Sequence, residues 1–386
     1  MTEPAGVEIA IQNPSPFWRG GTVVTPWKPI AEKRSISDTA VHLIDTLNDA
    51  VVPAQVDRID RSDPERAVLV FTLPGAIEPG LEDYGRDCAR FIVEEGAAAD
   101  VPDAGIIDVT GKGVKLINEH LEAWLTLAAD PCDDGRNWFG GAFTSIQVDR
   151  LEMLDAIAAV IGIHHDPEKR LQLDRIQIPR PPWAPGYLQY ETMFDKSYRI
   201  ESQTTGPVRA SVTIASEPFS FVDKHPHTKV VQEFECSLHR VLSVYRGGDY
   251  IGEDVYLKAI AAGGAFATNF SFSTGYFLQM DLSLRPRVTH HPYVPDWFAV
   301  ACDPAVAPRH GYAFATDRHS GHVYNPPPHY PNRDTEHKAF AWRIGPGKAA
   351  RNVHTFKHGT LPESLSEASG QAWYEHIFKP MQARVL

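Results

Sequence analysis

The chain has 386 residues, 43% of them hydrophobic and 22% charged, which is the composition of a folded globular protein rather than a disordered or membrane-embedded one. Its length is enough for two domains. The formal net charge of -12 argues against nucleic acid and anionic lipid, because both bind basic patches. We therefore expect neither nucleic acid nor a membrane among its partners.

The N-terminal residues and the cysteines indicate a cytoplasmic protein. MTEPAGVEIAIQ lacks a charged segment followed by an apolar run, so it does not predict a signal peptide. No apolar run in the sequence is long enough to span a bilayer. The four cysteines lack CxxC spacing and are expected to be reduced thiols. They are Cys88, Cys132, Cys236 and Cys302.

Short alternating segments separated by turns predict strands in the first part of the chain. Residues 7–12 (VEIAIQ) alternate as a half-buried strand does, and TVVTPW at 22–27 predicts the next strand. Residues 41–56 contain two such segments around an Asn-Asp turn, which predicts a hairpin. AVLVFTLPG at 67–75 ends at a Pro-Gly turn. Together these segments predict a small β-sandwich domain over residues 1–108.

The rest of the chain predicts one larger antiparallel β domain over residues 109–386. Strands continue without intervening helices, which favours a large sandwich over a parallel α/β sheet. The expected strands include GVKLINEHLEAWLTL, GGAFTSIQV, PVRASVTIAS, KVVQEFECSLHRVLSVY, YIGEDVYLKAI, GYFLQMDLSL, WFAVACD, GYAFATD and KAFAWRIG. Residues 82–98 and residues 151–163 are candidate helices, and the second stretch fits a strand and a loop equally well. The predicted fold class is all-β.

Several segments, taken in chain order, resemble the C-terminal β-domains of glycoside hydrolase family 38 α-mannosidases. NPSPFWRGGTVV and VPAQVDRID resemble the small β-domain of that family, with its Asn-Pro turn and VPAQ hairpin. GVKLINEHLEAWLTL and GGAFTSI resemble two strands of its large sandwich. GPVRASVTI, HGYAFATDRHSGHVY and DTEHKAFAWRIGPG follow in the family's order. The resemblance is collinear from about residue 7 to residue 360.

The resemblance implies a fold and a carbohydrate context, but it carries over no catalytic residues. It implies a galactose-mutarotase-like super-sandwich for residues 109–386. In the family the zinc ion, the nucleophile and the acid belong to an N-terminal α/β barrel, and these 386 residues show no βα alternation that would form one. A separate catalytic-barrel subunit is therefore one expected partner.

Histidine, arginine and aromatic residues gather in the second half of the chain. They are densest in residues 318–334, where three consecutive prolines predict an exposed loop. Such mixtures bind sugars, because aromatic rings cover C–H patches while Arg and His donate hydrogen bonds to hydroxyl or carboxylate groups. The candidate catalytic residues are Arg318, His319, His322 and Tyr324. The candidate substrate-binding residues are Arg285, His290, His291, Trp297, His329 and Tyr330.

The leading hypothesis is a carbohydrate-active protein related to glycoside hydrolases, which binds or acts on an oligosaccharide or glycoside at loops of the large sandwich. One alternative is a stand-alone polysaccharide or oligosaccharide lyase, because abstracting the proton next to a uronate carboxylate needs a charge neutraliser and a base, roles suited to Arg, His and Tyr. The other is a non-catalytic sugar-binding module. A hydrolase would need two carboxylates across a cleft, and the sequence does not pair them.

No cofactor is expected. The alternative is a divalent metal held by histidines, because His225 and His227 lie on one face of an extended segment and His290 or His291 would supply a third ligand. The chain has no phosphate-binding glycine motif and no GxSxG elbow, which argues against nucleotide and serine-hydrolase chemistry. A carbohydrate ligand is the expected small-molecule partner, and assembly into a homo-oligomer is left open.

Overall fold

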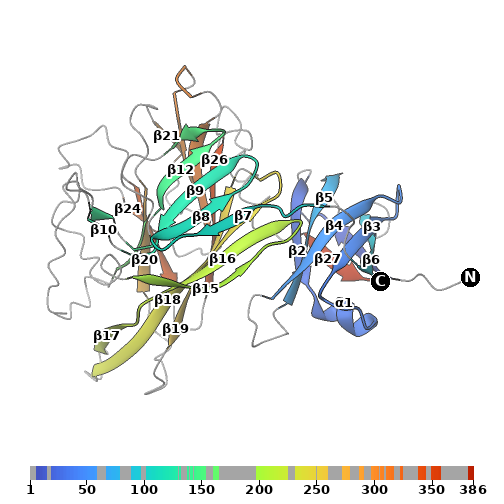
Figure 1. The fold of residues 1–386 in the computed structure, drawn as a ribbon, viewed down its shortest axis with the longest axis horizontal. Helices are drawn as coiled ribbons and strands as arrows, with labels where there is room; N and C mark the ends of the chain where they lie inside the picture. Colours follow the sequence, from blue (N-terminus) through green and yellow to red (C-terminus); the bar gives the residue numbers. More distant parts are fainter. Residues whose placement is uncertain are drawn as a thin grey trace, which may run out of the picture. The chain divides into compact units, whose positions relative to one another are not determined.

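The fold is all-β with antiparallel sheets, as predicted (Figure 1). Within the described residues one short helix occurs, α1 (Lys28–Lys33), which the sequence analysis did not predict. No helix of that part of the chain is both long and apolar enough to cross a membrane. The computed structural model describes residues 6–14, 19–58, 67–78, 88–96, 101–128, 130–131, 137–138, 140–141, 143–153, 160–164, 197–224, 231–248, 250–259, 272–278, 287–290, 297–303, 305–307, 310–316, 322–324, 338–344, 349–357 and 381–386.

The chain forms two compact units. The first comprises Met1–Gly105, Thr205–Ala210 and Ala368–Leu386, and the second comprises Ile106–Thr204 and Ser211–Glu367. In the first unit, β27 (Gln382–Val385) pairs antiparallel with β1 (Val7–Gln12). Segments from opposite ends of the sequence therefore lie side by side in one sheet (Figure 1).

A seven-stranded sheet in the order β2-β5-β4-β3-β6-β1-β27 makes up most of the first unit. Buried side chains from its strands form one core, in which the rings of Phe71 and Phe91 meet edge to face with centroids 5.4 Å apart. Burying a side chain of this size contributes about 1.5–3 kcal/mol. The remaining strands are β2 (Arg19–Pro26), β3 (Val41–Asp45), β4 (Val51–Arg58), β5 (Ala67–Ile77) and β6 (Ala89–Glu95).

A buried polar network surrounds Gln55 of β4. Its Oε1 accepts hydrogen bonds from the backbone N–H groups of Val208 (2.9 Å) and Arg209 (2.8 Å), and its Nε2 donates to Asp57 Oδ1 (2.8 Å). Arg209 Nη2 forms an ion pair with Asp57 Oδ2 at 2.7 Å. A Cβ added to Gly206 would lie 2.6 Å from Gln55 Oε1, so a larger residue there would push the Gln55 amide out of this position. The amide thus satisfies backbone groups that burial would otherwise leave without partners.

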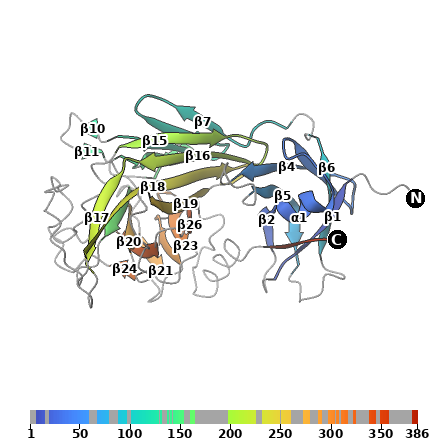
Figure 2. The ribbon, with the colours of Figure 1, turned by 90° about the horizontal axis from the view of Figure 1, so that it is seen from below.

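The second unit is built around a nine-stranded and a five-stranded sheet. The nine-stranded sheet has the order β15-β16-β18-β19-β26-β23-β22-β21, with β17 paired to β18, and Figure 2 shows β15, β16 and β18 side by side. Its strands are β15 (Tyr198–Thr204), β16 (Arg209–Ser216), β17 (Phe219–Lys224), β18 (Val231–Tyr245), β19 (Tyr250–Ala259), β21 (Arg287–His290), β22 (Trp297–Ala301), β23 (His310–Thr316) and β26 (Ala349–Lys357).

Within the described residues, the second unit contains the five-stranded sheet and two smaller sheets besides the nine-stranded one. The five-stranded sheet, in the order β13-β12-β9-β8-β7, consists of β7 (Ile106–Val109), β8 (Gly113–Ile117), β9 (Leu121–Thr126), β12 (Phe143–Val148) and β13 (Leu151–Glu152). The four-stranded sheet, in the order β14-β20-β25-β24, consists of β14 (Val160–His164), β20 (Phe272–Leu278), β25 (Lys338–Ile344) and β24 (His322–Tyr324). The two-stranded sheet pairs β10 (Asp130–Pro131) with β11 (Asn137–Trp138).

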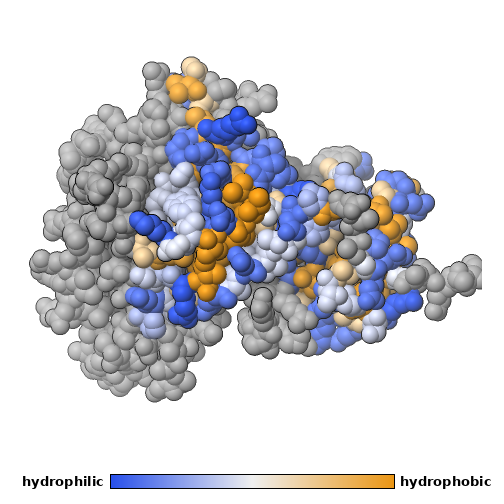
Figure 3. Space-filling model, viewed as in Figure 1, coloured by the Kyte–Doolittle hydropathy of each residue, from blue (hydrophilic) through white to orange (hydrophobic). Residues whose placement is uncertain are grey.

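The edge strand β7 exposes apolar side chains. Ile106 is 61% exposed and Val109 is 43% exposed. Figure 3 shows apolar side chains among hydrophilic ones on this part of the second unit. Asp108 lies between the two and adds a charge to the edge, which is one way in which natural edge strands avoid further strand pairing.

The candidate helix at residues 82–98 is wrong where the structure describes it, and residues 151–163 follow the strand alternative. Residues 89–95 of the first stretch form β6, in which Phe91 and Val93 are buried and their neighbours are not, the period of a half-buried strand. Packing of these side chains in the core overrides the helix propensity of the surrounding Ala, Arg and Glu residues. In the second stretch β13 and β14 are strands, and residues 154–159 lie outside the described residues.

Candidate functional site

Four of the sequence-predicted site residues lie on described strands. His322 and Tyr324 lie in β24, opposite Ala341 and Ala339 of β25. His290 ends β21 and pairs with Ala299, while Trp297 begins the neighbouring strand β22. The structure therefore places the first two residues on one strand and the last two on adjacent strands of another sheet. Arg285, His291, Arg318, His319, His329 and Tyr330 lie outside the described residues.

The histidine-bound metal remains a prediction. His225 and His227 lie outside the described residues, as does His291. Among the described side chains, no group of three or more His, Cys, Asp or Glu residues is arranged to hold a metal ion.

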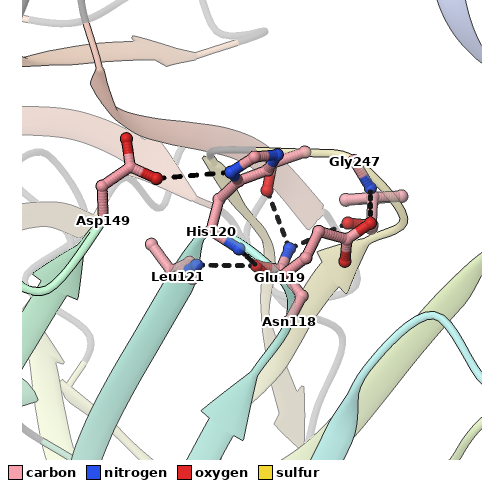
Figure 4. A network of polar contacts seen from close by, with 8 residues as sticks. Asn118, Glu119, His120, Leu121, Asp149 and Gly247 are labelled. Atoms are coloured by element: carbon pink, nitrogen blue, oxygen red, sulfur yellow. Dashed lines mark hydrogen bonds and ion pairs between the residues drawn. The ribbon is translucent and has the colours of Figure 1, made fainter.

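The best-defined polar network at a loop of the second unit is centred on Asn118, between β8 and β9 (Figure 4). Its Nδ2 donates to the backbone carbonyls of Tyr245 (2.8 Å) and Gly248 (2.7 Å). Its Oδ1 accepts from the backbone N–H groups of His120 (2.9 Å) and Leu121 (2.7 Å). One amide therefore shapes its own turn and attaches it to the turn between β18 and β19.

Glu119 and His120 extend this network toward the surface. Glu119 Oε1 accepts a hydrogen bond of 2.6 Å from the backbone N–H of Gly247, and Figure 4 shows its side chain directed at that residue. His120 Nδ1 lies 3.3 Å from Asp149 Oδ1, with the two side chains 37% and 39% exposed. A pair this exposed adds at most about 1 kcal/mol to stability. The pair therefore contributes little to the stability of the fold, and both side chains are accessible to solvent.

Two tyrosines flank the turn between β18 and β19. The rings of Tyr245 and Tyr250 stack with centroids 4.9 Å apart and an interplanar angle of 25°, and both residues are half-buried. A Cβ added to Gly252 would lie 2.9 Å from the Tyr245 hydroxyl oxygen, so the absence of a side chain there leaves room for the ring. The sheet thus holds an aromatic pair beside the Asn118 network.

A fully buried ion pair lies deeper in the second unit. Arg240 Nε donates to Glu253 Oε1 at 2.6 Å, with both side chains 0% exposed, and Arg240 Nη1 donates to the carbonyl of Gly141. The Arg240 guanidinium also lies 5.9 Å from the centroid of the Phe143 ring. Burial raises the pKa of the neighbouring Tyr198 above its usual value; Arg240 opposes this rise and Glu253 adds to it. This cluster is inaccessible and has a structural role.

Ser237, His239 and Glu201 form a chain of hydrogen bonds. Ser237 Oγ lies 2.8 Å from His239 Nε2, and His239 Nδ1 lies 2.9 Å from Glu201 Oε2. Because a carboxylate only accepts, Nδ1 carries a proton, and in the neutral form of the ring Nε2 accepts from the serine hydroxyl. Ser237 is 3% exposed and His239 is 1% exposed, so these two side chains are closed to solvent, whereas Glu201 at the end of the chain of bonds is exposed.

Neither the Asn118 network nor the Ser237–His239–Glu201 chain of hydrogen bonds was predicted from the sequence. An Asn between the apolar segments GVKLI and LEAWL is a recognisable turn signal, and it would have divided the expected strand at residue 118. The partner carbonyls lie 127 and 130 residues further along the chain, which no local pattern indicates. Ser237 and His239 likewise meet Glu201 only because β15, β16 and β18 are neighbours in one sheet.

Comparisons with known proteins give a likeness of fold. No protein-family model matches the sequence, and no curated protein matches it. An α-mannosidase from Enterococcus faecalis V583 has a similar structure, with a TM-score of 0.51 and 9% identity over 100% of this chain and 46% of that chain. A glycosyl hydrolase family 38 protein from Enterococcus faecalis gives a TM-score of 0.48 and 10% identity over 100% of this chain and 48% of that chain. The chain thus spans about half the length of either protein.

Proposed function

We propose that this protein is a carbohydrate-active protein related to glycoside hydrolases, which binds or acts on an oligosaccharide or glycoside at loops of its second unit. The observation that carries the proposal is the likeness to an α-mannosidase over the whole of this chain, at a TM-score of 0.51. The collinear sequence motifs of residues 7–360 support the same relationship. Fold likeness alone does not transfer an activity, so the proposal depends on a site.

The proposed site is the loop that contains Arg318 and His319, with His322 and Tyr324 after it. An arginine and a histidine donate charge-assisted hydrogen bonds to hydroxyl and carboxylate oxygens, and a tyrosine ring covers the apolar face of a sugar. The same groups would neutralise and deprotonate a uronate in a lyase. Arg285, His290, His291, Trp297, His329 and Tyr330 are the proposed sugar contacts.

A separate catalytic-barrel subunit is the proposed protein partner. This chain spans 46% of the length of the Enterococcus α-mannosidase, so chemistry that resides elsewhere in that protein lies outside these 386 residues. A cytoplasmic location is also proposed, because the four cysteines of the sequence lack CxxC spacing.

A glycan-panel screen for binding and turnover tests the proposal. Arg318→Ala and His319→Ala are expected to weaken binding, while Arg90→Ala, an exposed arginine of the first unit, serves as the matched control. Rising absorbance in the unsaturated-uronate band would identify a lyase, and sugar release from aryl glycosides a hydrolase. Binding without either signal would identify a sugar-binding module. The loop site is refuted if both variants behave like the wild type, and the function is refuted if no carbohydrate binds.

A further inference from the structure

The turn between β18 and β19 combines aromatic and polar groups that no part of the proposed loop site uses. The stacked rings of Tyr245 and Tyr250 are half-buried, so each keeps part of its surface in contact with solvent. A tyrosine in such a position offers an apolar body and a polar tip. This is the kind of surface against which the C–H face of a pyranose ring packs.

The position of this aromatic pair is fixed by the fold. Tyr245 is the last residue of β18 and Tyr250 is the first of β19, and both strands lie within the nine-stranded sheet. Asn118 holds the carbonyls of Tyr245 and Gly248, and Glu119 holds the N–H of Gly247. A ligand that packs there would bind a preformed surface, which reduces the entropy lost on binding.

Glu119 and His120 belong to the turn that is hydrogen-bonded to the turn between β18 and β19, and both side chains are at least partly accessible to solvent. Glu119 is exposed and uses Oε1 for Gly247, and His120 uses Nδ1 for Asp149. Within the described part of the chain, neither Glu119 Oε2 nor His120 Nε2 has a hydrogen-bond partner in the protein. A carboxylate oxygen accepts from sugar hydroxyls, and an imidazole nitrogen donates or accepts according to its tautomer.

The charge of the surface selects among sugars. Glu119 and Asp149 are both exposed carboxylates. A hydroxyl placed against Glu119 would donate to its carboxylate, whereas a uronate carboxylate at the same place would meet a like charge, even with Arg246 in the neighbouring turn. We propose that Tyr245, Tyr250, Glu119 and His120 form a binding site for one pyranose ring of a neutral oligosaccharide. This site rests on the proposed carbohydrate function, and it is distinct in sequence from the loop at residues 318–334.

Calorimetric titration of the purified chain with a neutral mannotetraose and with a tetragalacturonate tests the site. Wild-type protein is expected to bind the mannotetraose at this site, whereas any binding of the tetragalacturonate should be unaffected by Tyr250→Leu. Tyr250→Leu should weaken binding of the mannotetraose about tenfold or more, the loss typical of truncating an aromatic contact. Tyr250→Phe keeps the ring and should change the affinity by no more than about twofold.

Glu119→Gln provides a second variant that preserves the fold, since the amide oxygen can still accept from Gly247. It should weaken mannotetraose binding by about threefold to tenfold, the value of one hydrogen bond. Unchanged affinity in Glu119→Gln and in folded Tyr250→Leu overturns this site. If Arg318→Ala still abolishes binding in that case, the proposed function stands without it. If neither the mannotetraose nor any glycan of the panel binds the wild type, both proposals fall.

Discussion

The Arg240 guanidinium and the Glu253 carboxylate form a hydrogen-bonded ion pair at 2.6 Å, with both side chains fully excluded from solvent. Removing two charges from water is costly, and their attraction offsets that cost only when the geometry is good and the remaining polar atoms are also bonded. The bond from Arg240 to the carbonyl of Gly141 and the Phe143 ring contribute to this compensation.

Loss of one partner of this pair should therefore destabilise the second unit strongly. Arg240→Met leaves Glu253 as an uncompensated buried charge, and we expect a loss of about 3–5 kcal/mol in the free energy of unfolding, measured by urea denaturation. The double variant Arg240→Met, Glu253→Leu should recover part of that loss. Lys28→Met, which breaks the exposed pair of Lys28 with Glu32, should cost less than about 1 kcal/mol. Equal losses in Arg240→Met and Lys28→Met would contradict this account.

Asn118 should contribute more to the stability of the second unit than its small side chain suggests. Asn118→Ala removes four hydrogen bonds, two to the turn between β18 and β19 and two within its own turn. At about 0.5–1.5 kcal/mol for each bond, we expect a loss of roughly 2–6 kcal/mol in unfolding free energy. Hydrogen exchange at Gly247 should also accelerate. Asn48→Ala, which removes a single exposed bond to Ala50, is the matched control and should cost about 1 kcal/mol or less.

Alternation of apolar and polar residues is what made the strands of the first unit predictable. The hairpin expected over residues 41–56 is confirmed by β3 and β4, whose register places Leu43 opposite Val52. Val41 and Leu43 are buried and His42 between them is not, so the sequence pattern and the burial pattern agree. The strand expected at residues 7–12 is confirmed for the same reason.

Pairings between distant segments were not predictable from the sequence. A four-residue strand such as β27 has no distinctive pattern, and only the fold brings it beside β1. Gln55 was noted only as part of the VPAQ motif, although its amide bonds backbone groups 153 and 154 residues away. The Asn118 network was missed because its partners come from a different sheet of the same unit.

Gln55 provides a further test of the structure. Gln55→Ala would leave the buried N–H groups of Val208 and Arg209 without their acceptor. Since each unsatisfied buried group costs about 1–3 kcal/mol, the first unit should lose roughly 2–6 kcal/mol in unfolding free energy. Gln203→Ala, at an exposed position, should have almost no effect in the same denaturation measurement. A loss below about 1 kcal/mol in Gln55→Ala would contradict the network.

Because of Tyr198, the free energy of unfolding should depend on pH in the alkaline range. Burial raises the pKa of its phenol above the usual 10.0, so the native state holds this proton where the unfolded chain releases it. The part of the unfolding free energy that comes from this phenol is fully present below pH 10.0. It is lost as pH rises, by up to about 1.4 kcal/mol per pH unit. Tyr198→Phe should lower the slope of unfolding free energy against pH above 10.0. Identical slopes in the wild type and this variant would refute the assignment.

The hydrogen bonds from Ser237 through His239 to Glu201 follow the order of nucleophile, base and acid in serine hydrolases. Reaction also needs access for a substrate, and Ser237 and His239 are only 3% and 1% exposed. Both lie within β18, two residues apart on the same face. We therefore infer that the chain of bonds stabilises the sheet rather than carrying out acyl transfer.

A fluorophosphonate probe should accordingly leave Ser237 unlabelled in the folded protein, as judged by intact-protein mass spectrometry beside a serine hydrolase that reacts under the same conditions. Ser237→Ala should instead lower the unfolding free energy by about 1 kcal/mol, because His239 Nε2 loses its donor inside the protein. Labelling of the wild type that disappears in Ser237→Ala would show that the serine is reached by substrates, and the structural interpretation would then be wrong.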